Sequence, residues 1–499
     1  MDTIKGHFTP TILQSAMGEP LRSEQRINDF FPRILTRVDM LVLFIAIVLF
    51  IPNASVVQAT QGAGAATYLY WVIGTITFLI PGAIIAGQLN RFMPVDGSIY
   101  VWTHRALGPL FGFFAGFCSW FPGVLVLLSA AASVLTLIQG IGVQISGINA
   151  NWLAPTWQQG IVVIIILLLA GWLSTLPLKR LMKIAKVVIL FYGLGIFIVG
   201  MAGIVWLLSG HSPQPALTTS TLGFGGQNIV LYGVIVLALL GVEVPLHMAA
   251  ETKERSAASL FLRWGPLLVL IAYLLGTFGV MAIEPQNVAA SGYSTLSAVQ
   301  TVFGTAASVF IGLIFISFFI IAAVAYNVTF ARILFVSALD HRLPLALAKV
   351  NKNKAPNLAT NIQTIIVLVM TGGRRMVRNA SSSPWIVNLQ IAIGSIPAIQ
   401  AILLPALLSI PITNHPPNMV VGTSSILATI DRWMIHYSRC PKKKSCKSFC
   451  PTSNALIPLL ILSGFRKAGS SRLLSHNPLS PQTIVSIFPL YPLLSKACG

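Results

Sequence analysis

Nine apolar segments constrain this chain more than any other feature of its sequence. Most of them approach the roughly 20 residues that an α-helix needs to cross the hydrocarbon core of a bilayer. Of the 499 residues, 55% are hydrophobic and 9% are charged, which excludes a soluble globular class. We therefore expect an all-α polytopic membrane protein. The segments lie at about 40–57, 70–89, 107–138, 157–176, 187–208, 230–250, 264–283, 307–331 and 358–371.

The basic residues of the connecting loops predict the orientation of these segments. Loops with Lys or Arg alternate with loops that have none, such as 58–69, 139–156 and 209–229. Because cytoplasmic loops are enriched in Lys and Arg, the pattern predicts a multi-pass protein of the cell (inner or plasma) membrane with a cytoplasmic N-terminus. The bilayer is then its main partner, and no nucleic acid is expected.

The alternation fails after the ninth segment, where Arg374, Arg375 and Arg378 occupy a loop that should face outside. Residues 374–499 also hold 13 Lys or Arg but one acid, Asp431. We interpret 373–499 as an anomalous basic region that is frameshifted, replaced or disordered.

Four potential zinc ligands lie in that region, but their spacing matches no common zinc site. No metal site and no cofactor are therefore expected. The four residues are His436, Cys440, Cys446 and Cys450.

Two segments contain helix breakers near their middles. The first has Pro52 followed by Asn53, and the sixth has Gly241 and Pro245. The sixth segment comes five segments after the first, which is an odd number, so the two would cross the membrane in opposite directions. Paired broken helices of opposite direction indicate inverted repeats with a binding site between them at the bilayer midplane.

The sixth segment also carries a carboxylate, Glu243, whose burial at membrane depth would cost about 2.5–3.5 kcal/mol. Such an expensive residue would bind a cation or carry a coupling proton. The alternative is a structural carboxylate that caps a half-helix. His247, four residues further on, lies on the same helical face and would either relay protons with Glu243 or be an ordinary core histidine.

Four stretches in the right order resemble the amino acid–polyamine–organocation superfamily of permeases, over roughly residues 38–371. Met93–Trp102 resembles the pattern P-x-x-G-G-x-Y-x-W, and Gly108–Gly116 resembles the glycine-rich start of helix 3. Leu240–Lys253 resembles the stretch from G-[FV]-E to E-x-K-N-P, and Ala331–Pro344 resembles the pattern S-R-x-x-Y-x-x-A-R-D-G-x-L-P.

The resemblance implies a leucine-transporter-type fold with two inverted five-helix repeats. The cytoplasmic tail would be 1–37 and the first repeat 38–208. The second repeat, 209–372, would be incomplete, and the anomalous region 373–499 would follow it.

In this family the broken helices 1 and 6 hold the substrate's carboxylate and ammonium groups. The residues that match the two breaks are Pro52, Asn53, Ala54 and Ser55 in helix 1, and Leu237, Leu239, Leu240, Gly241 and Val242 in or beside the break of helix 6. Leu237 stands where arginine/agmatine antiporters have a gating tryptophan, which disfavours arginine-type exchange.

We therefore expect a secondary transporter, not an enzyme, that moves amino acids or related small amines by alternating access. Transport would be proton-coupled or exchange, with sodium a weaker candidate. A truncated or frameshifted remnant that no longer transports is the first alternative. A membrane sensor or membrane-embedded enzyme is the second. The particular substrate and the oligomeric state stay open.

Overall fold

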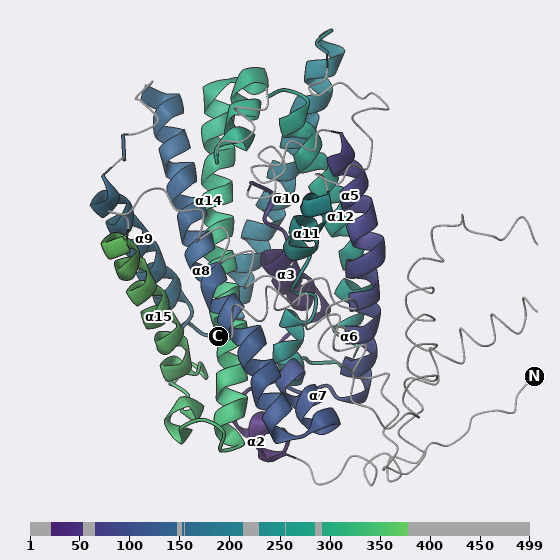
Figure 1. The fold of residues 1–499 in the computed structure, drawn as a ribbon, viewed down its shortest axis with the longest axis vertical. Coiled ribbons are helices and arrows are strands. Elements are labelled where there is room, and N and C mark those ends of the chain that lie inside the picture. The colour runs from purple at the N-terminus through teal and green to yellow at the C-terminus, as the bar shows by residue number, and fades with distance from the viewer. Residues whose placement is uncertain are drawn as a thin grey trace, which may run out of the picture. The chain divides into compact units, whose positions relative to one another are not determined.

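The chain divides into two compact units, Met1–Val420 and Val421–Gly499. The computed structural model describes residues 21–52, 65–146, 152–153, 155–212, 229–254, 256–284 and 292–377, all of which lie in the first unit. Within these ranges the architecture is helical, and β-pairing is limited to one isolated bridge between Leu35 and Thr252 (Figure 1). The expected all-α class is confirmed.

The described helices follow the expected apolar segments, with two additional short α-helices, α2 and α7, at one end of the bundle and the short 3₁₀ helix η3 in an expected loop. In chain order the elements are α2 (Arg22–Phe30), α3 (Arg37–Val48), α5 (Ala66–Gly74), η1 (Thr75–Leu79), α6 (Ile80–Phe92), α7 (Ser98–Leu107), α8 (Pro109–Ser146), α9 (Thr156–Leu173), α10 (Leu178–Leu208), α11 (Ile229–Ala238), η2 (Val244–Glu251), α12 (Ser259–Met281), α14 (Ser294–Leu339), η3 (Leu345–Ala348) and α15 (Asn357–Val377).

Five helices of the described part are long and apolar enough to cross a membrane, namely Ala66–Phe92, Pro109–Ile145, Leu178–Leu208, Ser259–Met281 and Ser294–Leu339. Two shorter apolar helices cover Trp157–Leu173 and Asn357–Thr371. Together they confirm a multi-pass membrane protein. The segments around α3 and α11 contain shorter helices because each is interrupted by a break, at Leu49 and at Leu239.

The eighth segment differs most from its expected bounds of 307–331. α14 begins at Ser294 and ends at Leu339, with a kink at Gly304, whose φ is +82°. Leu296 and Val299 are buried before the kink, and Phe335 is buried near the end. Helix packing therefore continues into stretches that hydropathy assigned to loops.

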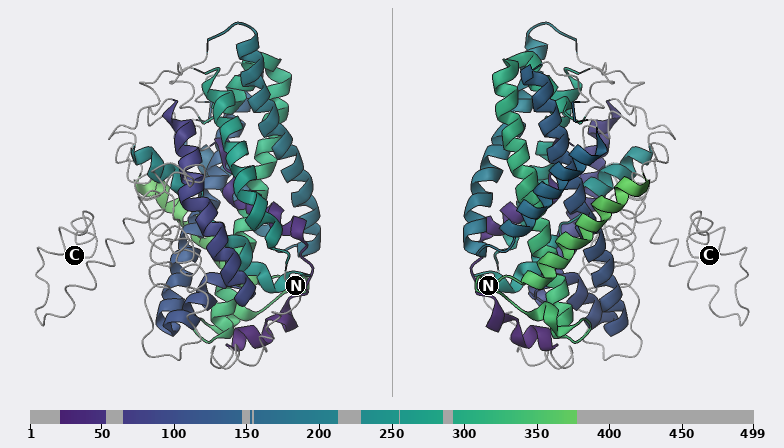
Figure 2. Two further views of the ribbon diagram at one scale, coloured as in Figure 1. Left: turned by 90° about the vertical axis from the view of Figure 1, so that its right-hand side faces the viewer. Right: turned by 90° about the vertical axis from the view of Figure 1, so that its left-hand side faces the viewer.

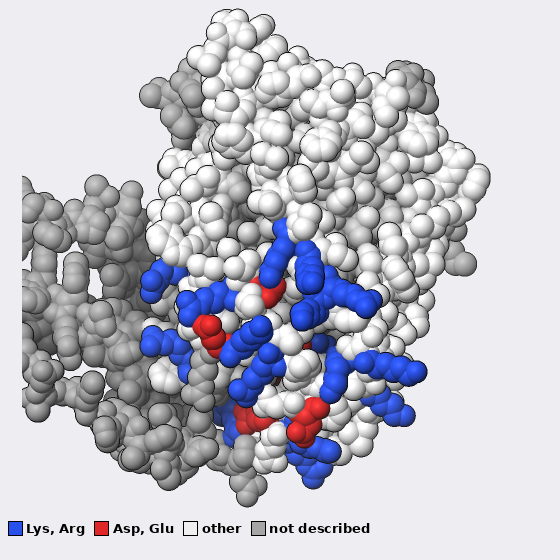
Figure 3. Space-filling view, turned by 180° about the vertical axis from the view of Figure 1, so that it is seen from behind, with Lys and Arg blue, Asp and Glu red and all other residues white. Residues whose placement is uncertain are grey.

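α3 lies in the interior, where it packs against α10, α12 and α14 (Figure 1). α15 crosses obliquely beside α9 and α14 (Figure 2). On the face shown in Figure 3, the Lys and Arg side chains gather toward one end of the described surface, and the opposite end of that face shows none. α2 and α7 lie at this end (Figure 1), which we call the charged end.

Gly108, Gly112 and Gly116 have the small-xxx-small spacing of close helix contact, and the geometry agrees at two of these positions. A Cβ atom on Gly112 would lie 2.6 Å from the Cβ of His104, and one on Gly116 would lie 3.3 Å from the Cβ of Tyr100. α7 therefore approaches α8 closely because α8 carries glycines at this spacing. Gly108 instead has a φ of +93° and ends α7.

A closer approach, between α10 and α12, generates a stability prediction. A Cβ on Gly279 would lie 2.1 Å from the carbonyl oxygen of Val199, so Gly279→Ala would force the two backbones apart. We expect a loss of about 1–3 kcal/mol, measured as a lower midpoint of thermal unfolding in detergent. Gly193→Ala is the matched control, because a Cβ there meets no atom within 4 Å. Equal midpoints for the two variants would contradict the close crossing.

Candidate functional site

The first break follows directly from Pro52. α3 ends at Val48, and Leu49 leaves helical geometry with φ −101° and ψ 75°. A proline removes the hydrogen bond to the carbonyl four residues earlier and clashes with that carbonyl, which here is the carbonyl of Val48. That oxygen accepts instead from the hydroxyl of Tyr273, at 2.6 Å.

Three tyrosine hydroxyls satisfy the last carbonyls of α3. The Tyr326 hydroxyl donates to the Ile47 carbonyl at 2.8 Å, and the Tyr192 hydroxyl donates to the Leu49 carbonyl at 2.8 Å. Tyr192 and Tyr273 also accept backbone N–H groups beyond the break, from Ile51 at 3.3 Å and from Phe50 at 3.2 Å respectively. Each of these two hydroxyls therefore bridges a carbonyl and an amide across the gap.

Stacked aromatic rings hold two of these tyrosines in place. Tyr192 stacks on Phe318 with ring centroids 3.6 Å apart, and Tyr273 stacks on Trp71 at 3.9 Å. The indole N–H of Trp71 donates to Thr277 at 3.1 Å. Buried phenol groups need a polar partner. The carbonyls and amides at the break supply that partner, and the tyrosine hydroxyls supply the hydrogen bonds that the broken helix lacks.

The second break lies between α11 and η2, at Leu239–Glu243. Gly241 has a φ of +108°, a conformation that favours glycine. A Cβ there would lie 2.8 Å from Cγ2 of Ile47, so the two breaks touch. Pro245 lies in the first turn of η2, where a missing N–H has no helical partner to lose.

The predicted substrate residues take different positions. Pro52, Leu239, Gly241 and Val242 are buried, whereas Leu237 and Leu240 keep part of their surface exposed. Asn53, Ala54 and Ser55 lie outside the described residues. The described members lie in the two breaks or within a few residues of them, and their role in binding stays a prediction.

Glu243 is the residue before η2, and its side chain is partly exposed between the buried Val242 and Val244. Its carboxylate interacts with its own backbone N–H, and within the described part of the chain it has no hydrogen bond to another side chain. It is close enough to Tyr326 for an electrostatic interaction. A carboxylate so placed is available to a ligand or a proton.

His247 lies toward the charged end. Its ring is buried, with Nδ1 2.9 Å from Ser98 Oγ and the ring edge against Phe330. Its carbonyl accepts from the Gly97 amide at 3.0 Å. In the described ranges no hydrogen bond joins His247 to Glu243, so a proton relay between them stays a prediction.

Three further polar side chains have structural partners. Lys186 pairs with Asp39 at 2.8 Å. Thr329 donates to the carbonyl of Ala325 at 2.7 Å, within its own helix. The side chain of Asn327 donates to Thr364 at 3.2 Å, away from the break.

The cysteine-rich zinc candidate (His436, Cys440, Cys446 and Cys450) lies outside the described residues. Among the residues that are described, no group of three or more His, Cys, Asp or Glu could hold a metal ion.

We call Tyr192, Tyr273 and Tyr326 the tyrosine cap, and their role was not predicted from the sequence. Its signal is a single tyrosine within each of three apolar spans, at positions 192, 273 and 326. A phenol hydroxyl at membrane depth requires a partner, but sequence does not say which carbonyl it reaches.

The sequence is similar to known proteins of one family. The family model of amino acid permeases matches residues 35–419. The match continues past residue 371, where the resemblance described above ends, and leaves 420–499 unmatched. A gamma-aminobutyric acid permease of Bacillus subtilis is 26% identical over 324 residues, covering 62% of this chain and 64% of the relative. A lysine-specific permease of Lactococcus lactis is 26% identical over 362 residues, covering 64% of each chain. An uncharacterized transporter of Legionella pneumophila is 23% identical over 344 residues, covering 65% of this chain and 70% of the relative.

The tyrosine cap generates a prediction about stability. Tyr273→Phe leaves the Val48 carbonyl and the Phe50 amide without a hydroxyl, and a buried unsatisfied group costs about 1–3 kcal/mol. We expect a clearly lower thermal midpoint in detergent. In the control Tyr232→Phe the lost partner is Thr77, which keeps its own bond to the Ile73 carbonyl at 2.7 Å. The cap is refuted if the two variants lose the same stability.

Proposed function

The chain belongs to the amino acid permease family, and from that premise we propose that it is a secondary transporter that moves an amino acid or a related small amine by alternating access. The observation that carries the proposal is the contact between two broken helices, where Gly241 approaches Ile47. Broken backbone at membrane depth is tolerated where it lines a cavity or is buried in protein. Two such breaks in contact support a shared binding site.

The polarity of the half-helices supports a substrate with an amino group. The C-terminal end of α11 presents carbonyls, which favour a cation. The corresponding carbonyls of α3 are already occupied by tyrosine hydroxyls. We therefore propose that the ammonium group binds at Leu239 and Leu240, with the partly exposed Glu243 nearby, and that Pro52–Ser55 receive the carboxylate. The names of the gamma-aminobutyric acid and lysine permeases agree with such a substrate class.

We propose that coupling uses a proton or exchange. Glu243 is the candidate proton carrier, because its carboxylate is partly exposed and has no partner from another side chain within the described ranges. Sodium is disfavoured because three consecutive carbonyls at the end of α3 already accept hydroxyl groups. His247 remains a second candidate for the proton path.

The charged end is proposed to face the cytoplasm, by the positive-inside rule. The N-terminus would then be cytoplasmic and the protein would lie in the cell membrane. A product that no longer transports stays the alternative. Purified protein that elutes from size exclusion as one species, and is thermally stabilised by one member of a panel of amino acids and amines, would support the transporter.

Glu243→Gln tests the proposed site. Neutralising the carboxylate should abolish uptake into proteoliposomes or remove its pH dependence between about pH 5 and 8, because the proton carrier is lost. Asp29→Asn is the matched control, since Asp29 is exposed on α2. Uptake by Glu243→Gln that equals wild type at every pH would exclude this role.

Replacing sodium tests the coupling ion. If the carbonyls of α3 are committed to the tyrosines, uptake should be unchanged when NaCl is replaced by choline chloride at constant pH. A drop of tenfold or more in initial rate would contradict proton coupling or exchange as proposed. Imposing a pH gradient across the same vesicles provides the positive arm for a proton symporter.

A further inference from the structure

Three charged side chains are buried together at the charged end. Asp96 follows α6, Glu251 ends η2 and Arg332 lies on α14, with exposed fractions of 2%, 1% and 2%. Arg332 Nε donates to Glu251 Oε1 at 2.6 Å. Asp96 Oδ1 accepts from the Ala250 amide at 2.7 Å, so all three groups meet around the end of η2.

The cluster is unbalanced, because it combines two carboxylates with one guanidinium. Asp96 Oδ2 and Arg332 Nη1 have no hydrogen-bond partner among the described residues. Burying an uncompensated charge costs several kcal/mol, and a proton on Asp96 would remove that charge. Asp96 stands at the variable position directly before Gly97, the first glycine of the pattern P-x-x-G-G.

Residues 21–36, which we call the N-terminal strap, cover this cluster. The ring of Phe31 lies 3.9 Å from the guanidinium carbon of Arg332. The Glu251 carbonyl accepts from the amides of Ile34 and Leu35 at 2.8 and 3.0 Å, and the Lys253 amide donates to the Leu35 carbonyl at 2.9 Å. The strap therefore seals the end of η2 with backbone hydrogen bonds.

The first turns of the strap are also anchored. The amide and hydroxyl of Ser23 each donate to the carboxylate of Asp340 at 2.9 Å, at the end of α14. Glu24 forms an ion pair with Arg105 on α7. The strap thus connects α7, α14 and η2, the elements whose ends would have to separate for a substrate to leave at this side.

We propose that the Asp96–Glu251–Arg332 cluster is a proton-binding site that controls the release of the N-terminal strap, with Asp96 as the group that takes up the proton. The proposal rests on the proposed transport function for its purpose, the opening of the cytoplasmic side. Its site is separate from Glu243 and can be tested without a substrate. Protonation closes the strap, and loss of the proton favours its release.

The sign follows from the environment of Asp96. Burial raises the pKa of Asp96 well above its usual range, and the Glu251 carboxylate raises it further, while Arg332 and the Ala250 amide oppose the rise. When the strap opens, water reaches Asp96 and its pKa returns toward the usual value. The closed state therefore binds more protons, and its stability falls as the pH rises through the raised pKa.

The other titratable groups on the packed elements are distinct from this site. His247 of η2 points to Ser98, and His104 lies further along α7. Directly after α14, Asp340 binds Ser23 and His341 contacts Arg22 of the strap. Glu24 of the strap is paired with Arg105. Glu251 and Arg332 are the charged groups that act on Asp96.

Hydrogen exchange of the full-length protein in detergent tests the proposal. The readout is the protection of the amides of Ile34, Leu35 and Lys253 between about pH 6 and 8.5, corrected for intrinsic exchange. For wild type we expect protection to fall by up to about tenfold per pH unit, the slope for one proton released on opening. Asp96→Asn should stay protected throughout, since it is permanently neutral. Asp96→Gly, the second variant, should also lose the pH dependence.

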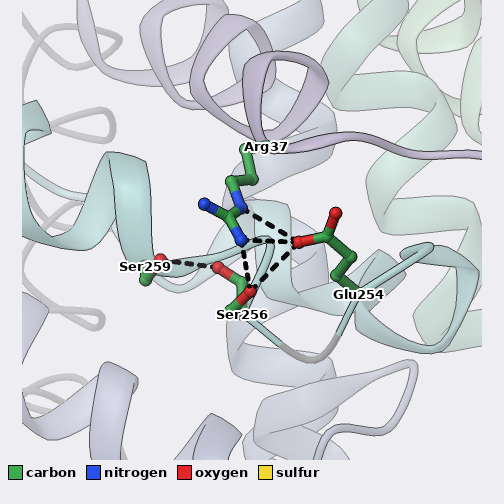
Figure 4. A network of polar contacts seen from close by, with 4 residues as sticks. All are labelled: Arg37, Glu254, Ser256 and Ser259. Carbon is green, nitrogen blue, oxygen red and sulfur yellow. Dashed lines mark hydrogen bonds and ion pairs between the residues drawn. The ribbon is translucent and has the colours of Figure 1, made fainter.

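Glu254→Gln is the matched control. Glu254 is exposed and binds Arg37, with Ser256 beside it (Figure 4), so this variant should keep the wild-type slope. A wild-type protein without a pH-dependent slope overturns the proposal, and so does an Asp96→Asn protein that retains the slope. Glu243→Gln separates this proposal from the transport function. A Glu243→Gln protein that loses uptake but keeps the wild-type slope shows that the strap responds to pH independently of transport.

Discussion

The structure depends on how a broken helix satisfies its backbone at membrane depth. Pro52 removes the donor that the Val48 carbonyl would use, and hydrocarbon offers no water in its place. Tyrosines from α10, α12 and α14 supply the missing hydrogen bonds. The local consequence of one proline is therefore a set of contacts that ties the interior helix α3 to three long helices of the bundle.

The second break is built differently. Gly241 turns the chain by adopting a positive φ, and η2 resumes as a tighter 3₁₀ helix that begins at Val244. No tyrosine cap holds Glu243, whose carboxylate is without another side chain as partner in the described part of the chain. The first break is thus held by the surrounding bundle, whereas the second keeps a charged group available. The first break is therefore suited to holding α3 in position, and the second is suited to binding a ligand or a proton.

The positions of the breaks could be predicted because proline and glycine act locally. Pro52 and Gly241 change the backbone within a few residues, and apolar runs of bilayer length identify most of the spans. The tyrosine cap could not be predicted, since Tyr273 and Val48 lie 225 residues apart in sequence. The short helices α2 and α7 were missed for a related reason. Their stability comes from packing at the charged end, where Ile27 and Tyr100 are buried, and not from a long apolar run.

η2 connects two carboxylates, Glu243 at the second break and Glu251 beside the strap. Glu243 precedes its first residue and Glu251 is its last, with a kink at Met248 (φ −115°, ψ 26°) between them. The element packs against α3 near the breaks and, through Glu251, against the strap and Arg332. A displacement of η2 as a unit would change the surroundings of both carboxylates at once. Because linkage between sites is reciprocal, a ligand that favours one position of η2 would then change proton binding at Asp96, and protonation there would change the affinity for the ligand.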